Sequence, residues 1–247
     1  RKNKPDAIII HTFNTSLLIF ILLAKLFKVT KIIILVGNPP FKDLLIKLRI
    51  FLFFLRILKV PLVFCSKYVF EEFKKFSKLP HNSITIRHGY DISKAVFDKK
   101  RFKDKLIKNR KLKITMVARL DYIKDHETLI KAFLSINNNQ WELQLVGEGH
   151  NEAYLKNLVN SLNGNDRIKF LGSRKDVLNI LSNTEIFAFS TTVKEGFGIV
   201  LIESLSVGLP IIASDVPPCR EVLLDGEGGI LVSPGDLKIW KEKLSLL

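Results

Sequence analysis

Two acidic residues enclose a glycine-containing turn in the second half of the chain. Glu195 directly precedes Gly196, Phe197 and Gly198, and Glu203 stands eight positions after Glu195. A helix that begins near Gly198 would direct its free backbone N–H groups, and the positive end of its dipole, toward this turn. Such a helix start binds phosphate, and glycine lets a diphosphate approach the main chain.

The two carboxylates indicate hydroxyl groups on either side of this anion site. Ionised carboxylates only accept hydrogen bonds, which suits sugar hydroxyls and does not suit phosphate. Glu203 would lie about one and a half turns into the helix, whereas Glu195 would stay on the loop at the mouth of the site. A diphosphate with a sugar at each end fits this requirement. The spacing alone is equally compatible with an ordinary loop and an amphipathic helix with one exposed Glu.

Two cations in an upstream loop point to the same ligand. Arg119 and Lys124 are five residues apart and follow a predicted strand, and a curled loop would bring both to one diphosphate. Arg can clamp two oxygens, whereas Lys acts as a point charge. Basic residues in loops are more often solvated, so this pair alone does not indicate a binding site. The surrounding sequence decides between the two interpretations.

That surrounding sequence resembles the retaining nucleotide-sugar glycosyltransferases of family 4, the glycosyl transferases group 1. Residues 195–203 are similar to the E-x7-E motif of that family, and residues 208–236 closely resemble the sequence that follows this motif in the family. Arg119 and Lys124 match its GRL…K pattern, although Ala118 replaces the usual glycine. The resemblance covers most of the chain.

The resemblance implies roles for these side chains. Glu195, Arg119 and Lys124 would act at the reacting centre, where the carboxylate holds hydroxyls of the transferred sugar and the cations hold the diphosphate. Glu203 would accept hydrogen bonds from the ribose hydroxyls. The other residues expected at the donor are Gly147, Arg174, Gly196, Phe197, Gly198, Ile199 and Val200.

The implied reaction retains the anomeric configuration and assigns no side chain as nucleophile. Negative charge develops on the leaving diphosphate, where the two cations and the helix start would stabilise it without reorganising. The sequence has no Asp-x-Asp metal motif. We therefore expect no metal and no cofactor, with the nucleotide-diphosphate sugar as substrate.

The first half offers one candidate contact to the donor. In the resembled family a His near the end of an early strand often meets the donor sugar, but the matching place, 35–38, has none. His11 ends the preceding predicted strand and is a possible contact, although a lone His is more often structural.

The elements that would position these residues alternate between strands and helices, which predicts an α/β fold with parallel sheets. In the first half, the strands expected are 7–10, 32–36, 61–65 and 83–86, and the helices are 15–28, interpreted as buried, 41–59 and 67–76. In the second half, the strands are 114–117, 142–146, 168–171, 186–189, 211–213 and 230–232, and the helices are 126–136, 151–162, 175–182, 198–207 and 217–223. Doubly wound sheets bind ligands at the carboxyl ends of their strands.

We therefore expect the GT-B arrangement of two Rossmann-like, doubly wound domains. Residues 1–95 would form an incomplete N-terminal, acceptor-side domain, 96–112 a charged linker and 113–247 a C-terminal nucleotide-sugar-binding domain that lacks its last helix. The chain lacks an initial Met, and the family's first strands would precede Arg1. It is accordingly interpreted as a fragment.

Charge is unevenly distributed along the chain. The net charge is +15, of which the first 110 residues contribute +17 and the remainder −2. This asymmetry indicates that the first half faces a polyanion, either nucleic acid or an anionic membrane, although a genome that favours lysine explains part of it. The hydrophobic content of 47% is that of a globular protein. Two cysteines without a CxxC motif indicate a reducing cytoplasm.

Residues 41–59 are the best candidate for membrane contact. Their longest uninterrupted apolar run is six residues, far below the roughly 20 needed to span a bilayer. Bulky apolar residues alternate with cations, which is typical of a helix lying in a membrane interface; a core helix with a basic solvent face is the alternative. The cations are Lys42, Lys47, Arg49, Arg56 and Lys59. We expect a cytoplasmic protein that is peripheral on the inner membrane face.

The sequence thus predicts an enzyme that moves a sugar from a nucleotide donor to a glycan or lipid-linked acceptor, in envelope polysaccharide or lipopolysaccharide synthesis. A phosphorylase or epimerase on the same fold is one alternative, which the missing pyridoxal signature and the E-x7-E context disfavour. A basic nucleic-acid-binding module is another. It lacks aromatic stacking motifs and a recognised helix motif, so we expect no nucleic-acid partner.

Overall fold

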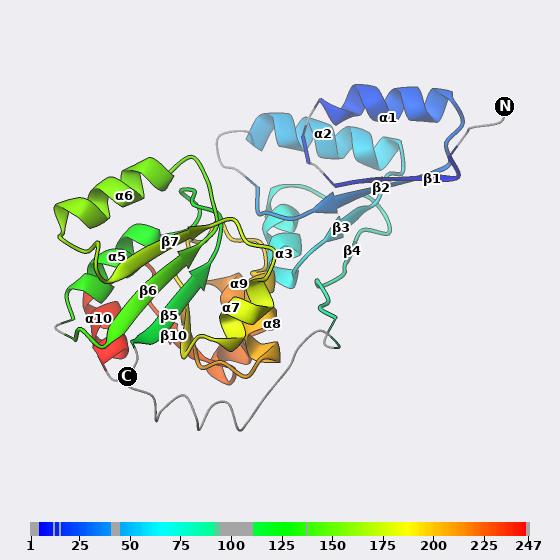
Figure 1. The fold of residues 1–247 in the computed structure, drawn as a ribbon. Coiled ribbons are helices and arrows are strands. Elements are labelled where there is room, and N and C mark those ends of the chain that lie inside the picture. The colour runs from blue at the N-terminus through cyan, green and yellow to red at the C-terminus, as the bar shows by residue number, and fades with distance from the viewer. Residues whose placement is uncertain are drawn as a thin grey trace. The chain divides into compact units, whose positions relative to one another are not determined.

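The computed structural model describes residues 5–11, 13–14, 16–40, 45–91, 93, 111–136 and 138–245. The chain divides into two units, Arg1–His88 and Gly89–Leu247. Each unit contains a parallel sheet with its helices (Figure 1), so the predicted α/β class with two Rossmann-like units is confirmed. Residues 94–110, which include most of the predicted linker, lie outside the described residues.

A four-stranded sheet of order β1-β2-β3-β4 forms the first unit. Its elements are β1 (Ala7–Ile10), α1 (Leu17–Leu26), β2 (Lys31–Val36), α2 (Leu45–Ile57), β3 (Leu62–Phe64), α3 (Lys67–Phe76) and β4 (Ile84–Thr85). Because β1, β2 and β3 are consecutive neighbours, right-handed crossovers place α1 and α2 on the same face of the sheet. The two helices lie side by side (Figure 1).

The environment predicted for α1 is wrong. Its apolar run predicts a buried helix, yet only Ile21 and Ala24 of α1 are buried. Ile19 is 69% exposed and Leu26 is 75% exposed. A helix that is apolar on every side gives no sequence signal for the face it turns outward, since that signal comes from polar residues on one side.

A six-stranded parallel sheet of order β10-β9-β8-β5-β6-β7 forms the second unit. Its elements are β5 (Leu112–Val117), α5 (His126–Leu134), β6 (Trp141–Val146), α6 (Glu152–Ser161), β7 (Ile168–Gly172), α7 (Val177–Ser182), β8 (Ile186–Phe189), α8 (Ile199–Ser206), β9 (Ile211–Ser214), α9 (Pro217–Val222), the 3-10 helix η3 (Leu224–Gly226), β10 (Ile230–Val232) and α10 (Leu237–Ser245). Among the described residues, no helix of either unit is long and apolar enough to cross a bilayer.

The strand order of this sheet reverses between β5 and β8. The chain moves outward from β5 to β6 and β7, then returns to β8 on the other side of β5. Helices α5, α6 and α10 pack together as one layer, and α7, α8 and α9 as the other. The loops after β5 and β8 therefore lead to helices on opposite faces, and doubly wound sheets bind their ligands at such a reversal of strand order.

Helix α10 is absent from the predicted elements. It packs on α5, and its Trp240 is fully buried while Leu244 is 3% exposed. These two residues stand four apart among charged neighbours, and Ile239 packs partly buried against the same core, so the sequence shows a single helical repeat, too short to establish a helical period.

Candidate functional site at the carboxyl ends of β5 and β8

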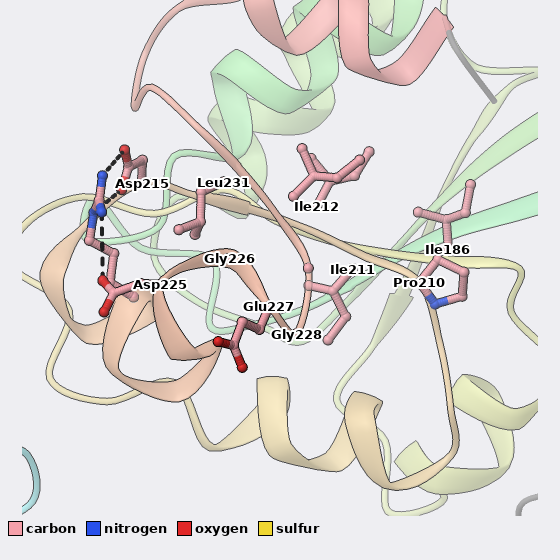
Figure 2. A pocket seen from close by; sticks show the side chains of 13 residues that line it. Ile186, Pro210, Ile211, Ile212, Asp215, Asp225, Gly226, Glu227, Gly228 and Leu231 are labelled. Carbon is pink, nitrogen blue, oxygen red and sulfur yellow. Dashed lines mark hydrogen bonds and ion pairs between the residues drawn. The ribbon is translucent and has the colours of Figure 1, made fainter.

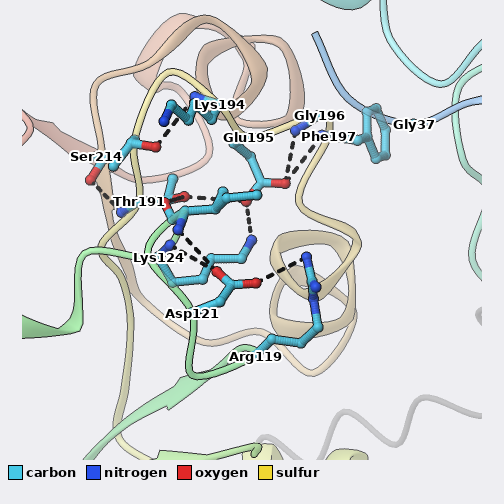
Figure 3. Close-up of polar contacts among 12 residues, drawn as sticks. Gly37, Arg119, Asp121, Lys124, Thr191, Lys194, Glu195, Gly196, Phe197 and Ser214 are labelled. Carbon is cyan, nitrogen blue, oxygen red and sulfur yellow. Dashed lines mark hydrogen bonds and ion pairs between the residues drawn. The ribbon is translucent and has the colours of Figure 1, made fainter. Parts of the chain in front are cut away.

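Lys124 and Glu195 meet at the reversal of strand order. Lys124 lies in the loop after β5, and its ammonium forms an ion pair with the carboxylate of Glu195 from the loop after β8 (Figure 3). The two side chains are only 12% and 10% exposed. The Lys124 ammonium also lies 4.7 Å from the ring centroid of Phe189, the last residue of β8. An ion pair shielded from water is much less screened than one on the surface.

Glu195 is buried rather than placed at the mouth of the site as predicted. The residue is 8% exposed, because its carboxylate turns back onto its own loop. Oε1 accepts hydrogen bonds from the backbone N–H groups of Gly196 at 3.0 Å and Phe197 at 3.4 Å. Oε2 accepts one from the Thr191 hydroxyl at 3.3 Å. The N–H groups predicted to face the donor therefore hold an internal carboxylate here.

Asp121 shapes the loop that carries the two predicted cations. Its Oδ1 accepts hydrogen bonds from the backbone N–H groups of Ile123 at 3.0 Å and Lys124 at 3.3 Å. Its Oδ2 pairs with the Arg119 guanidinium at 3.1 Å. The loop curls as expected, but the cations differ in environment, since the Arg119 side chain is 70% exposed.

Helix α8 begins directly after this network. Its N-cap, Gly198, has φ 84°, a left-handed conformation that side chains rarely adopt. A Cβ there would also lie 3.1 Å from the Leu201 side chain. Ile199 and Val200 form the first turn, so this helix starts where the sequence predicts it.

Glu203 lies on the second turn of α8 with its carboxylate unengaged. It is half-buried, and burial raises the pKa of its carboxyl. No described residue donates a hydrogen bond to this carboxylate or forms an ion pair with it. An acceptor that has lost part of its water shell and has no protein partner is suited to a ligand hydroxyl.

The glycine turn after β6 is required by a close approach of two loops. Gly147 has φ 137°, and a Cβ there would lie 2.0 Å from the Ala118 carbonyl oxygen. A Cβ at Gly149 would lie 2.3 Å from the Leu120 carbonyl oxygen. The family resemblance predicts that Gly147 contacts the nucleotide. In the structure, the close approach of the loop after β5 already requires glycine at this position.

Two predicted residues stand outside this network. The Arg174 guanidinium pairs with Asp176 at 2.8 and 2.9 Å, and this pairing holds the pKa of the Asp176 carboxyl at about 2. His11 is an exposed residue of the first unit. Their predicted roles at the donor stay predictions.

Sequence reasoning missed three residues that organise the site. Asp121 and Thr191 hold the loops as described; Asp121 stands two residues after the predicted cation Arg119, and Thr191 stands two residues after the end of β8. His126, the first residue of α5, is 1% exposed, and burial lowers the pKa of its imidazole to about 4. Its Nδ1 lies 3.3 Å from the Lys124 carbonyl oxygen, and no described residue bonds its buried Nε2.

Within the described part of the chain, no group of three or more His, Cys, Asp or Glu side chains could hold a metal ion. A cavity of about 750 Å³ lies elsewhere in the second unit, beside β9, β10 and η3 (Figure 2). Its cation, Arg220, is paired with Asp215 at 2.5 Å and Asp225 at 3.6 Å. None of the predicted site residues lines this cavity.

Comparison with known proteins found a matching family and several relatives. Residues 97–247 match the family described as glycosyl transferases group 1. An uncharacterized glycosyltransferase of Methanocaldococcus jannaschii is 28% identical over 279 residues, covering 98% of this chain and 67% of its own. The N-acetylgalactosamine-N,N'-diacetylbacillosaminyl-diphospho-undecaprenol 4-alpha-N-acetylgalactosaminyltransferase of Campylobacter jejuni is 35% identical over 120 residues, covering 48% of this chain and 32% of its own.

A solved structure shares the fold over nearly the whole chain. The Anabaena HepE protein, in complex with UDP and glucose, superposes with a TM-score of 0.78 at 20% identity, covering 96% of this chain and 67% of its own. The fold is thus the GT-B fold of glycosyltransferases. The chain spans about two thirds of the M. jannaschii protein and about a third of the C. jejuni protein.

Proposed function

This chain belongs to the glycosyl transferases group 1, and from that membership we propose that it moves a sugar from a nucleotide-diphosphate sugar to a glycan or lipid-linked acceptor. The Lys124–Glu195 ion pair at the strand-order reversal is the observation that carries this proposal. In a nucleotide sugar, the distal phosphate is bonded to the anomeric carbon, so phosphate oxygens and sugar hydroxyls are neighbours. A cation beside a carboxylate matches that junction.

The chemistry follows from where charge develops. The bond between the anomeric carbon and the phosphate oxygen breaks, and its electron pair leaves with the nucleoside diphosphate. Lys124, Arg119 and the start of α8 would stabilise that negative charge. Glu195 would hold hydroxyls of the transferred sugar, and Glu203 would accept from the ribose. We propose retention of configuration, with no protein nucleophile, no metal and no cofactor.

The remaining donor-site assignments are part of the same proposal. The turn from Gly196 to Gly198 and the first turn of α8 would face the diphosphate, with Gly147 beside the nucleotide and Arg174 near the base. Since the turn's N–H groups hold Glu195, donor binding would exchange a carboxylate oxygen for a donor oxygen on these groups.

The acceptor and location are proposed from the relatives and from charge. The C. jejuni relative is named for a diphospho-undecaprenol acceptor, which supports a lipid-linked or glycan acceptor in polysaccharide or lipopolysaccharide synthesis. Such an acceptor, with the basic first half, supports a cytoplasmic enzyme that is peripheral on an anionic inner membrane surface. Nucleic acid is not a proposed partner.

A thermal-shift panel of UDP-, GDP- and ADP-sugars tests the proposal. We expect one nucleotide class to raise the melting temperature, because saturating ligand at about 100 times its Kd stabilises the folded state by about 2.7 kcal/mol. Lys124→Met and Arg119→Met should each reduce that shift. Lack of response to any nucleotide, together with tight RNA binding at physiological salt, would favour the nucleic-acid alternative.

A further inference from the structure

Helices α1 and α2 turn large apolar side chains to solvent on the same side of the first sheet. We call these side chains the α1–α2 face; they are Ile19, Phe20, Leu22, Leu23, Leu26 and Phe27 on α1, and Ile46, Ile50, Phe53, Phe54 and Ile57 on α2. On each helix they recur three and four residues apart, so they form one stripe along it. Exposed apolar surface of this extent marks an interaction site.

Helix α1 ends in a hydrogen-bonded turn whose left-handed position is occupied by a lysine, which is unusual there. Lys28 has φ 59°, and its N–H donates to the Lys25 carbonyl at 2.9 Å. The next N–H, of Val29, reaches back to the Ala24 carbonyl at 2.9 Å. This is the helix end at which glycine is usual, since the position requires a left-handed conformation.

Helix α2 ends in the same way. Lys59 has φ 52°, and the N–H of Val60 donates to the Leu55 carbonyl at 2.9 Å. The same motif closes α6 with Asn163 at φ 54° and α8 with Gly208 at φ 72°. The chain thus places lysine, at a conformational cost, in the turns that end both helices of the α1–α2 face. A lysine here also favours the helix dipole, so binding and stability have to be measured separately.

The surroundings of the face are almost purely basic. Residues 7–70 contain nine Lys and Arg against one acidic residue, Asp43, which lies outside the described residues. Arg49 is tied to α3 by a hydrogen bond to the Phe76 carbonyl at 3.1 Å. On α2 and at the ends of α1 and α2, Lys28, Lys47, Arg56 and Lys59 are exposed and have no ion-pair partner among the described residues.

We propose that the α1–α2 face docks onto a membrane that contains anionic lipid, with Lys28 and Lys59 held at the lipid phosphates. The two helices lie in the plane of the interface, and their apolar stripes enter the boundary between headgroups and acyl chains. The unpaired cations add attraction to the negative surface. The inference rests on the proposed membrane location, and it adds α1, which sequence reasoning takes to be buried.

Co-sedimentation of the whole chain with vesicles tests this inference. The wild type should sediment with vesicles of phosphatidylglycerol and phosphatidylcholine, and weakly with phosphatidylcholine alone. The double variant Lys28→Gly/Lys59→Gly should lose roughly 25-fold in binding to anionic vesicles, since each lysine near the surface contributes about fivefold. Its melting temperature should hold or rise, because glycine relieves the left-handed strain.

Asn163→Gly is the matched control, since it changes the same motif in the second unit without changing charge. It should bind vesicles as the wild type does. Leu26→Ser/Ile46→Ser should weaken vesicle binding by removing apolar area. All variants should keep the thermal shift with the nucleotide sugar, so failure of docking is distinguishable from failure of the donor site.

Three results would overturn the inference. The wild type could fail to sediment with anionic vesicles. The double glycine variant could bind them as tightly as the wild type, which would leave the lysines with a structural role alone. Light scattering could reveal a dimer that Leu26→Ser/Ile46→Ser dissociates, which would assign the face to a second copy of the chain.

Discussion

Lys124 and Glu195 come from loops 71 residues apart in sequence and form a shielded ion pair where β5 and β8 end side by side. The parallel sheet produces this meeting, because its strand order reverses between these two strands and the carboxyl-end loops lie together. Each charge is the other's partner, so the two residues act as one unit. Changes to either are expected to affect stability and donor binding differently.

Lys124→Met should destabilise the protein by roughly 3 kcal/mol, because it leaves the Glu195 carboxylate buried without its cation. The double variant Lys124→Met/Glu195→Gln should recover most of that loss, since neither charge remains. Donor turnover should fall by about 10- to 1,000-fold in both, because the contact to the leaving group is gone. Melting curves and transfer assays on the same samples provide the measurement.

Arg119→Met is the control for the Lys124 and Glu195 variants, because the Arg119 side chain is 70% exposed. We expect its melting temperature to stay within about 1 °C of wild type, because exposed ion pairs contribute little, while turnover falls as for Lys124. A single Lys124→Met variant that is as stable as wild type would contradict the buried-pair description.

Glu203→Gln should raise the melting temperature at pH 7 and weaken the binding of the nucleotide sugar. Burial raises the pKa of this carboxyl, so the ionised form lowers stability at neutral pH, and that loss is relieved as pH falls through the folded-state pKa. The stabilising effect of the substitution should therefore shrink toward acid. Calorimetric titration with the donor should show weaker binding by about tenfold; unchanged affinity would remove Glu203 from the donor site.

Gly147→Ala should destabilise the second unit by about 3 kcal/mol or more, because the new Cβ would meet the Ala118 carbonyl oxygen at 2.0 Å. Gly235 is the matched control, with φ 71° and open space around a Cβ. Gly235→Ala should cost only about 1 kcal/mol of left-handed strain. Urea unfolding gives the free energy of unfolding of the two variants. Equal losses of this free energy would show that the contact between the loops after β5 and β6 is not close.

Stability should fall between pH 6.5 and pH 4 through His126. Burial lowers the pKa of its imidazole to about 4, so the unfolded chain takes up the proton first as pH falls. The loss of stability is absent above the ordinary pKa of about 6.5 and reaches about 3 kcal/mol once pH drops below the folded value. His126→Gln should flatten this part of the pH–stability curve; an unchanged curve would assign the acid sensitivity to other groups.

Periodic patterns predicted the individual strands and helices, and the glycine turn predicted the start of α8, because these features are local. The pattern does not reveal α10, because its buried residues, Trp240 and Leu244, give a single helical repeat. It misjudges α1 because exposure depends on which helices and strands surround it. The site shows the same limit. Residue types and spacing indicated Glu195, yet its turn onto the N–H groups of Gly196 and Phe197 is a tertiary arrangement that spacing does not encode.

A crystal structure of the chain soaked with nucleoside diphosphate tests the central claim most directly. The account predicts difference density for a diphosphate at the start of α8, with oxygens within hydrogen-bonding distance of Arg119 and Lys124 and the ribose near Glu203. Diphosphate density in the cavity beside β9 and β10, or anywhere away from Lys124 and Glu195, would contradict it.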